Sequence, residues 1–121
     1  MTNREKKIFD KETFLQAFSG METLAHDVTQ DFLNTLPDML FTIEQSIKDQ
    51  KVIELERSAH TLKGTLSHFY AGPAQDAAWA LEKLGKSKNM IGAEDLYQNL
   101  LKEVNQLKDE LQITLTAHFQ K

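Results

Sequence analysis

The chain has 121 residues, of which 40% are hydrophobic and 26% charged, and its formal net charge is −4. This length and balance predict one soluble globular domain that buries roughly two thirds of its unfolded surface. The absence of cysteine excludes disulfides, thiolate zinc sites and cysteine catalysis, and a negative charge without a dense Lys/Arg block argues against nucleic-acid binding.

The chain starts with a polar lead, residues 1–7, and no apolar segment of the signal-peptide kind follows it. No run of 18 apolar residues occurs anywhere in the sequence, so we expect no contact with a membrane and a cytoplasmic location. An initiating methionine and a short lead indicate a separate protein rather than a piece of a larger kinase.

Two helices are predicted in the first half of the chain. Asp10 is expected to be the N-cap of a short helix that runs to about Phe18 and stops at Ser19-Gly20. A long helix follows over about 22–48, and Pro37 predicts a kink or break near 34–36 because proline removes a ladder hydrogen bond. The expected inward stripe of this long helix consists of Leu24, Val28, Phe32, Leu36, Leu40, Ile43 and Ile47.

Three more helices are predicted in the second half. After a turn at Asp49-Gln50, a helix over 52–69 should end around 70–72, with a buried stripe of Val52, Leu55, Ala59, Leu62, Leu66 and Phe69. Pro73 fits the first turn of the next helix, 87–92 is a loop, and regularly spaced apolar residues from Leu96 to Leu115 mark the last helix. The predicted fold class is all-α, an antiparallel up-down four-helix bundle with a short N-terminal capping helix.

His60 lies off the buried stripe of its helix. At about 100° per residue it points away from Ala59 toward solvent, and Lys63 and Gly64 lie beside it at i+3 and i+4. A glycine inside a helix costs roughly 1 kcal/mol relative to alanine, which indicates that something must approach the backbone beside His60. The ordinary alternative is a solvated histidine and a glycine that permits a close helix crossing.

The string Ala59-His60-Thr61-Leu62-Lys63-Gly64 resembles the signature of the histidine-containing phosphotransfer (HPt) domain, a helical Ala-His-x-Leu-Lys-Gly. Weaker similarities cover about 8–117, which we take as the core of a single HPt-like domain over 1–121; they are Phe9-Asp10, Phe14-Leu15, Phe32-Leu33, Pro37-x-x-Leu40, Asp49, Ala77-Ala78, Leu81-Glu82 and Gly85-Lys86. The resemblance implies a phosphocarrier that accepts a phosphoryl group on Nε2 of His60 from a receiver-domain aspartate or a kinase. It would then pass the group to another receiver in a multistep two-component relay.

The resemblance also implies roles for the neighbours of His60. Lys63 would stabilise the charge of the phosphoryl group, and Gly64 would give the partner access. Glu82, 22 residues after the histidine, matches the family's Glu or Gln that orients the imidazole, and Lys86 is a candidate contact to the phosphoryl group or the partner. The alternative for Glu82 and Lys86 is an ordinary i,i+4 surface pair worth roughly 0.3–0.5 kcal/mol.

Four residues, Ile53, Glu56, Ser67 and Tyr70, are candidate contacts to a partner. Ile53 lies seven residues before His60 on the same face, where it would form an exposed docking patch or else pack under a neighbouring element. Tyr70 stands about where the family usually has glycine, so we expect a differently shaped helix end and an overhang of the site. Trp79, one turn before Glu82, could rim the site or be anchored in packing.

No metal or nucleotide site is predicted in this chain. His26, His68 and His118 lack ligand spacing, and no Walker-type glycine-rich cradle occurs, so we expect neither ATP binding nor autokinase activity. No cofactor is expected, since the Mg²⁺ of the reaction would belong to the receiver. The expected partners are response-regulator receiver domains and a sensor or hybrid histidine kinase, docked transiently on a monomer over less than roughly 1,200 Å². The alternative function is a non-catalytic helical-bundle interaction module descended from an HPt domain.

Overall fold

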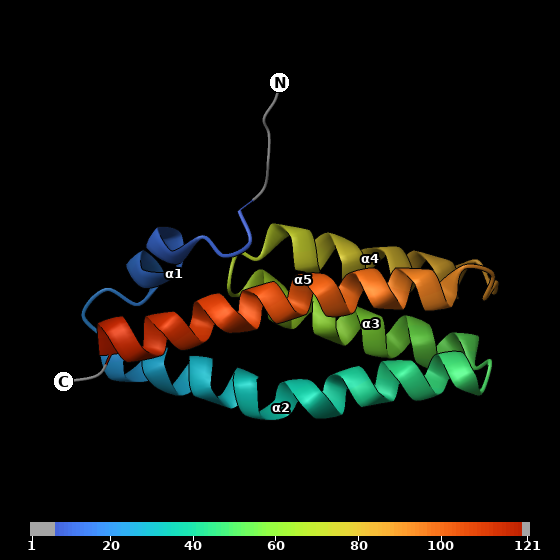
Figure 1. Cartoon of the computed structure of the whole chain (residues 1–121), viewed down its shortest axis with the longest axis horizontal. Helices are drawn as coiled ribbons and strands as arrows, with labels where there is room; N and C mark the ends of the chain where they lie inside the picture. The colour runs from blue at the N-terminus through green and yellow to red at the C-terminus, as the bar shows by residue number, and fades with distance from the viewer. Residues whose placement is uncertain (1–6, 120–121) are drawn as a thin grey trace, which may run out of the picture.

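The structure is a computed structural model that describes residues 7–119 (Figure 1). Within this range it consists of helices and contains no strand, so the all-α prediction is confirmed. The helices are α1 (Lys11–Ala17), α2 (Glu22–Lys48), α3 (Val52–Ser67), α4 (Gly72–Lys86), α5 (Ala93–Thr114) and a π-helical segment, Leu115–Phe119. None of the helices in the described range combines the length and apolarity needed to cross a bilayer.

The four long helices lie side by side along a common direction, and α1 lies beside one end of them (Figure 1). Helix α3 packs most extensively against α4 and also contacts α2, while α5 contacts both α4 and α2. The predicted stripe on α3 is buried at Leu55, Ala59, Leu62 and Leu66. The helix that carries His60 is therefore fixed on two sides, by α2 and by α4.

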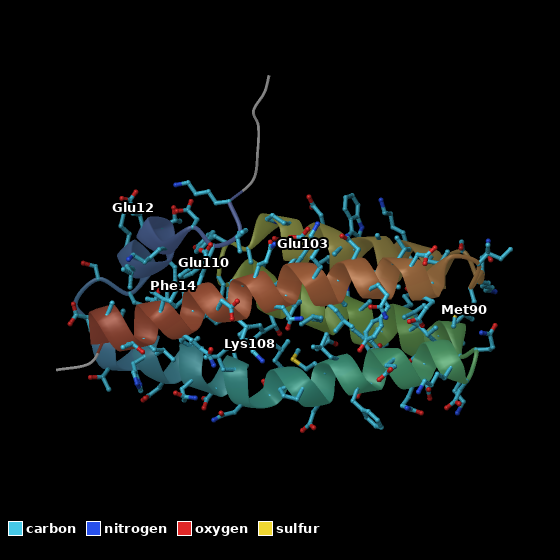
Figure 2. All side chains as sticks on the ribbon, viewed as in Figure 1. Glu12, Phe14, Met90, Glu103, Lys108 and Glu110 are labelled. Carbon is cyan, nitrogen blue, oxygen red and sulfur yellow. The ribbon has the colours of Figure 1, made fainter. Side chains whose placement is uncertain are left out.

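Helix α1 is attached to the long helices by aromatic packing. It begins at the predicted N-cap, Asp10, whose Oδ1 accepts a backbone N–H of the first turn at 3.2 Å. The ring of Phe14 lies 5.1 Å from that of Phe69, and Phe69 lies 4.7 Å from Phe32 of α2. Figure 2 shows Phe14 between α1 and the long helices and Glu12 directed away from them. One aromatic cluster therefore joins α1, α2 and the segment after α3.

Helix α2 has the predicted bounds but differs from the prediction at two points. Of the predicted kink or break, the break is wrong, since the helix runs unbroken through Pro37; its ribbon changes direction about halfway along, as a kink would make it do (Figure 1). Leu24, predicted to face inward, is 48% exposed, and Ala25 is buried in its place. The buried stripe reaches Ala25 through Thr29, whose hydroxyl donates to the Ala25 carbonyl at 2.8 Å. A threonine satisfied in this way can be buried without losing a hydrogen bond.

The connection between α3 and α4 begins two residues earlier than predicted. Helix α3 ends at Ser67, earlier than expected, while Gly72 opens α4 and Pro73 stands in its first turn as predicted. Tyr70 in the connecting turn has a φ of 53°, in the left-handed region. A residue with a Cβ pays roughly 1–2 kcal/mol for this conformation, whereas glycine adopts it freely. Tyr70 therefore stands at a position where the backbone favours glycine.

Replacing Tyr70 with glycine is expected to raise the free energy of unfolding by up to about 1 kcal/mol. The gain comes from relief of the left-handed conformation, reduced by the larger entropy of glycine in the unfolded chain. Urea denaturation of the Tyr70→Gly protein measures it, with Thr61→Gly as the control, since Thr61 has ordinary helical geometry and should lose stability. A loss of stability in both variants would contradict the strain argument.

Candidate functional site

The imidazole of His60 is exposed on one side and held on the other. Its side chain is 66% exposed, while Ala59 and Leu62 on the same helix are fully buried, so the ring points away from the core. Its Nδ1 lies 2.9 Å from Oε2 of Glu82 on α4. Its Nε2, on the far side of the ring, has no hydrogen bond to any residue in the described part of the chain. One ring nitrogen is therefore fixed and the other is open to an approaching group.

The carboxylate of Glu82 is shared by three cationic or donor groups, although its side chain is only 5% exposed. Its Oε2 contacts His60 Nδ1 and lies 3.9 Å from Lys86 Nζ. Its Oε1 lies 2.7 Å from Lys63 Nζ in an ion pair whose angles are poor for a hydrogen bond. The sequence placed Glu82 on the flank of α4 that could border His60, with an ordinary surface pair as the alternative, and gave no indication that its side chain is buried. Counter-charges from α3 make this burial tolerable.

The ionisation state of Glu82 decides which nitrogen of His60 carries the proton. Burial raises the pKa of the Glu82 carboxyl, but close contacts with Lys63 and His60, together with their charges, outweigh burial and leave the pKa below its ordinary value. The carboxylate is therefore ionised at neutral pH and accepts the N–H of His60 Nδ1. In the neutral imidazole this leaves the lone pair on Nε2.

The lowered pKa of Glu82 predicts a pH-dependent part of the protein's stability. Because the folded-state pKa lies below the ordinary value of 4.5, this stabilisation is fully present above pH 4.5 and is lost as the pH falls through the folded-state pKa. The loss in free energy of unfolding caused by Glu82→Gln should therefore shrink as the pH is lowered from about 6 to about 3. Urea titrations at several pH values measure it. Glu54→Gln, the same charge change at an exposed position of α3, is the control. A pH-independent difference between wild type and Glu82→Gln would contradict the assignment.

Two glycines near His60 have opposite surroundings. A Cβ at Gly64 would meet no atom within 4 Å, so nothing in the described structure requires glycine there. A Cβ at Gly85 would lie 2.8 Å from the backbone nitrogen of Glu56, so Gly85 allows α4 to approach α3 closely. The close helix crossing considered as the ordinary role of the motif glycine is therefore the role of Gly85. Gly64 instead leaves an open flank beside the imidazole.

An open hollow of about 350 Å³ lies beside the imidazole, lined by Ile53, Glu56, Arg57, His60, Glu82 and Lys86. Ile53 is 63% exposed, so the alternative in which it packs under a neighbouring element is wrong. A larger hollow of about 450 Å³ lies between α2 and α3 and shares Arg57 with the first. The smaller hollow is the candidate site, because it contains the imidazole and its carboxylate partner.

Two candidate partner residues lie outside this hollow. The hydroxyl of Ser67 donates to the carbonyl of Gly64 at 2.6 Å. Ser67 therefore lies on the open flank of the helix, and its hydroxyl hydrogen is already bonded to the helix backbone. Tyr70 is exposed, ten residues beyond His60, and does not line the hollow. A contact of either residue with a partner stays a prediction.

The sequence did not single out Arg57 and left Trp79 between two alternatives. Arg57 lines both hollows, and only its position three residues before His60 placed it on the same face. Trp79 is half-exposed, and its ring centroid lies 4.0 Å from Lys83 Nζ and 6.0 Å from Lys63 Nζ. These are cation–π distances. The structure thus favours Trp79 at the rim of the site over Trp79 anchored in packing.

Known proteins similar to this chain agree with the geometry. The family model of the Hpt domain matches residues 27–112, a range that contains both His60 and Glu82. The chain is also similar to the crystal structure of histidine-containing phosphotransfer protein B (HptB) from Pseudomonas aeruginosa PAO1, with a TM-score of 0.87 and 15% sequence identity over 94% of this chain and 99% of that chain. At this identity the likeness shows a shared fold. No curated protein gave a significant match. The family match covers well over half of the chain, which therefore belongs to the Hpt domain family of histidine phosphotransfer proteins in two-component signalling.

Proposed function

We propose that this protein is a phosphocarrier that accepts a phosphoryl group on His60 from a receiver-domain aspartate or a kinase and passes it to another receiver in a multistep relay. The observation that carries the proposal is the 2.9 Å contact between His60 Nδ1 and Glu82, which leaves Nε2 open on an exposed ring. The open flank at Gly64 supports it. The architecture we propose is an antiparallel up-down bundle of α2 to α5 capped by α1, with 1–121 as one domain.

The proposed transfer step uses the lone pair on Nε2 of His60. This lone pair attacks phosphorus while the bond between phosphorus and the donor carboxylate oxygen breaks, and that oxygen keeps the electron pair. Positive charge develops on the ring as the N–P bond forms. The Glu82 carboxylate stabilises this charge through the N–H of Nδ1, as an aspartate does for the histidine of a serine hydrolase. The same step in reverse delivers the phosphoryl group to the second receiver.

Lys63 is proposed to stabilise the charge on the transferring phosphoryl group, with Lys86 as a further contact to that group or to the partner. Replacing Lys63 with alanine is expected to slow transfer about ten- to a hundredfold, somewhat less than the loss of a fully buried donor. Single-turnover transfer from a phosphorylated receiver measures this rate. Lys48→Ala, which removes an exposed lysine of α2, is the control. Equal rates in the two variants would remove the role assigned to Lys63.

The proposed partners are receiver domains of response regulators and a sensor or hybrid histidine kinase. Ile53 and Glu56 would contact the partner within the hollow, Ser67 at the end of α3, and Tyr70 in the turn that follows it. The Mg²⁺ of the reaction would belong to the receiver. We propose a cytoplasmic monomer that relies on its donor for the phosphoryl group and does not use ATP itself.

The test is exposure to a small phosphodonor or a phosphorylated receiver, followed by intact mass measurement. The expected result is an acid-labile gain of about 80 Da, mapped to His60. No gain with any donor would overturn the phosphocarrier proposal and favour the non-catalytic interaction module.

A further inference from the structure

The ammonium of Lys63 already has partners before any phosphoryl group is present. It lies 2.7 Å from Glu82 Oε1 and 6.0 Å from the ring centroid of Trp79. A phosphoryl group on Nε2 of His60 would stand on the side of the imidazole opposite Glu82, because Nδ1 is the nitrogen that faces this carboxylate. The carboxylate that holds the ammonium therefore lies on the other side of the ring from the phosphoryl oxygens that the ammonium would neutralise.

The buried carboxylate would keep counter-charge if Lys63 left it. Oε2 of Glu82 retains the N–H of His60 at 2.9 Å and the ammonium of Lys86 at 3.9 Å. A buried carboxylate that loses its last cation is strongly destabilised, so a site without Lys86 would resist the departure of Lys63. With Lys86 in place, this resistance is reduced.

The aromatic ring at the rim would also keep a cation. Lys83 Nζ lies 4.0 Å from the ring centroid of Trp79, closer than Lys63 Nζ at 6.0 Å. Lys83 stands one helical turn after Trp79 on α4, so the two stay neighbours whatever Lys63 does. The Glu82 carboxylate and the Trp79 ring, the two groups that hold Lys63, thus each have a second lysine nearby.

We propose that Lys63 is a mobile counter-ion that rests between Glu82 and Trp79 in the unphosphorylated protein and moves onto the phosphoryl oxygens once His60 carries them. A phosphoryl group with a charge of about −2 attracts the ammonium more strongly than a carboxylate shared with other cations. Trp79 is a positioning residue in this exchange, because it keeps Lys63 near the site without touching the reacting atoms. The inference rests on the proposed role of His60 as phosphoryl acceptor and adds the two positions of the lysine.

The emission of Trp79 can report the exchange, because it is the only tryptophan of the chain. The protein would be phosphorylated with phosphoramidate, whose P–N bond breaks as the bond to Nε2 of His60 forms, and ammonia leaves after taking a proton from solvent. Intact mass gives the extent of phosphorylation in each sample. The Trp79 emission is expected to change in proportion to the mass gain and to return as the phosphohistidine hydrolyses.

Three variants identify the group that moves. Lys63→Met should lose the emission change even in fully phosphorylated samples, whereas Lys83→Met, the matched control on the same ring, should keep it. In Glu82→Gln the amide can still accept the N–H of His60 but holds Lys63 less strongly. The emission of unphosphorylated Glu82→Gln should therefore shift toward that of the phosphorylated wild type.

A separate comparison tests the positioning role of Trp79. Trp79→Phe keeps an aromatic face and should retain the transfer rate, while Trp79→Leu should raise it by up to roughly two- to fivefold, the fold-change of an exposed cation–π contact, because the lost contact stabilised only the resting position of Lys63. Both variants should unfold at the same urea concentration, which separates positioning from stability. Equal transfer rates in the two variants would overturn the role of Trp79.

The mass gain tests the proposed function, and the Trp79 emission tests the movement of Lys63, so each can fail without being mistaken for the other. Complete phosphorylation with unchanged Trp79 emission overturns the movement of Lys63, as does an undiminished emission change in Lys63→Met. Absence of any mass gain overturns the acceptor role of His60 and the inference with it.

Discussion

Replacing His60 with glutamine is expected to abolish phosphoryl acceptance, with no mass gain from any donor. The amide nitrogen of glutamine has no lone pair available for attack on phosphorus, but it can still donate to the Glu82 carboxylate. The fold should survive, because the histidine side chain is 66% exposed, and the free energy of unfolding should change by less than about 1 kcal/mol. Intact mass after treatment with a phosphorylated receiver measures acceptance, and urea denaturation measures the fold.

The control for this variant is His68→Gln, which removes an exposed histidine just beyond the end of α3. This variant should accept the phosphoryl group as fully as the wild type. Phosphorylation of the His60→Gln protein at the wild-type level would mean that another side chain is the acceptor, and peptide mapping would identify it.

A bulky side chain in place of Gly64 is expected to hinder the approach of the receiver and, at the same time, to stabilise the folded protein. Gly64→Leu should slow transfer from a receiver by about a hundredfold or more, since misplacement of the reacting groups by about 1 Å can cost this much. The same variant should be more stable by up to about 1 kcal/mol, because leucine favours the helix and a Cβ there meets nothing within 4 Å. Acceptance from phosphoramidate should fall less, since a small donor needs less room than a folded domain.

Gly85→Ala is the matched control with the opposite expectation. Its new methyl group would press on the backbone of Glu56 at 2.8 Å, and overpacking of this kind costs roughly 1–3 kcal/mol. Urea denaturation of both glycine variants, paired with single-turnover transfer, tests the assignment. A Gly64→Leu protein that transfers at the wild-type rate would show that the partner does not approach this flank.

The sequence predicted the exposure of His60 because the stripe on its helix is made of apolar residues at spacings of three and four. Leu55, Ala59, Leu62 and Leu66 are all buried, and the remaining face of α3 follows from helix geometry. On α2 the same reasoning failed at Leu24. There the buried stripe passes through Thr29, a residue that hydropathy does not place inside and whose hydroxyl is satisfied by its own helix.

The burial of Glu82 could not be predicted from its own helix. A carboxylate is buried only where other groups compensate its charge, and here Lys63 and His60 on α3 provide most of that compensation. The position of Trp79 at the site likewise depends on tertiary packing, because its contact with Lys63 joins two helices. Periodicity assigns a residue to a face of one helix, but it does not give the distance from that residue to the neighbouring helix.

The imidazole, its carboxylate partner and the surrounding lysines all come from two consecutive helices, α3 and α4, within residues 52–86. Helices α2 and α5 contribute mainly the apolar surfaces that bury the inner faces of this pair. Mutations that accumulate on the outer surfaces of α2 and α5 over evolutionary time therefore leave the histidine's surroundings intact. An identity of 15% with a protein of the same fold is compatible with such an arrangement, because sequence differences spread over the rest of the bundle need not reach this helical hairpin.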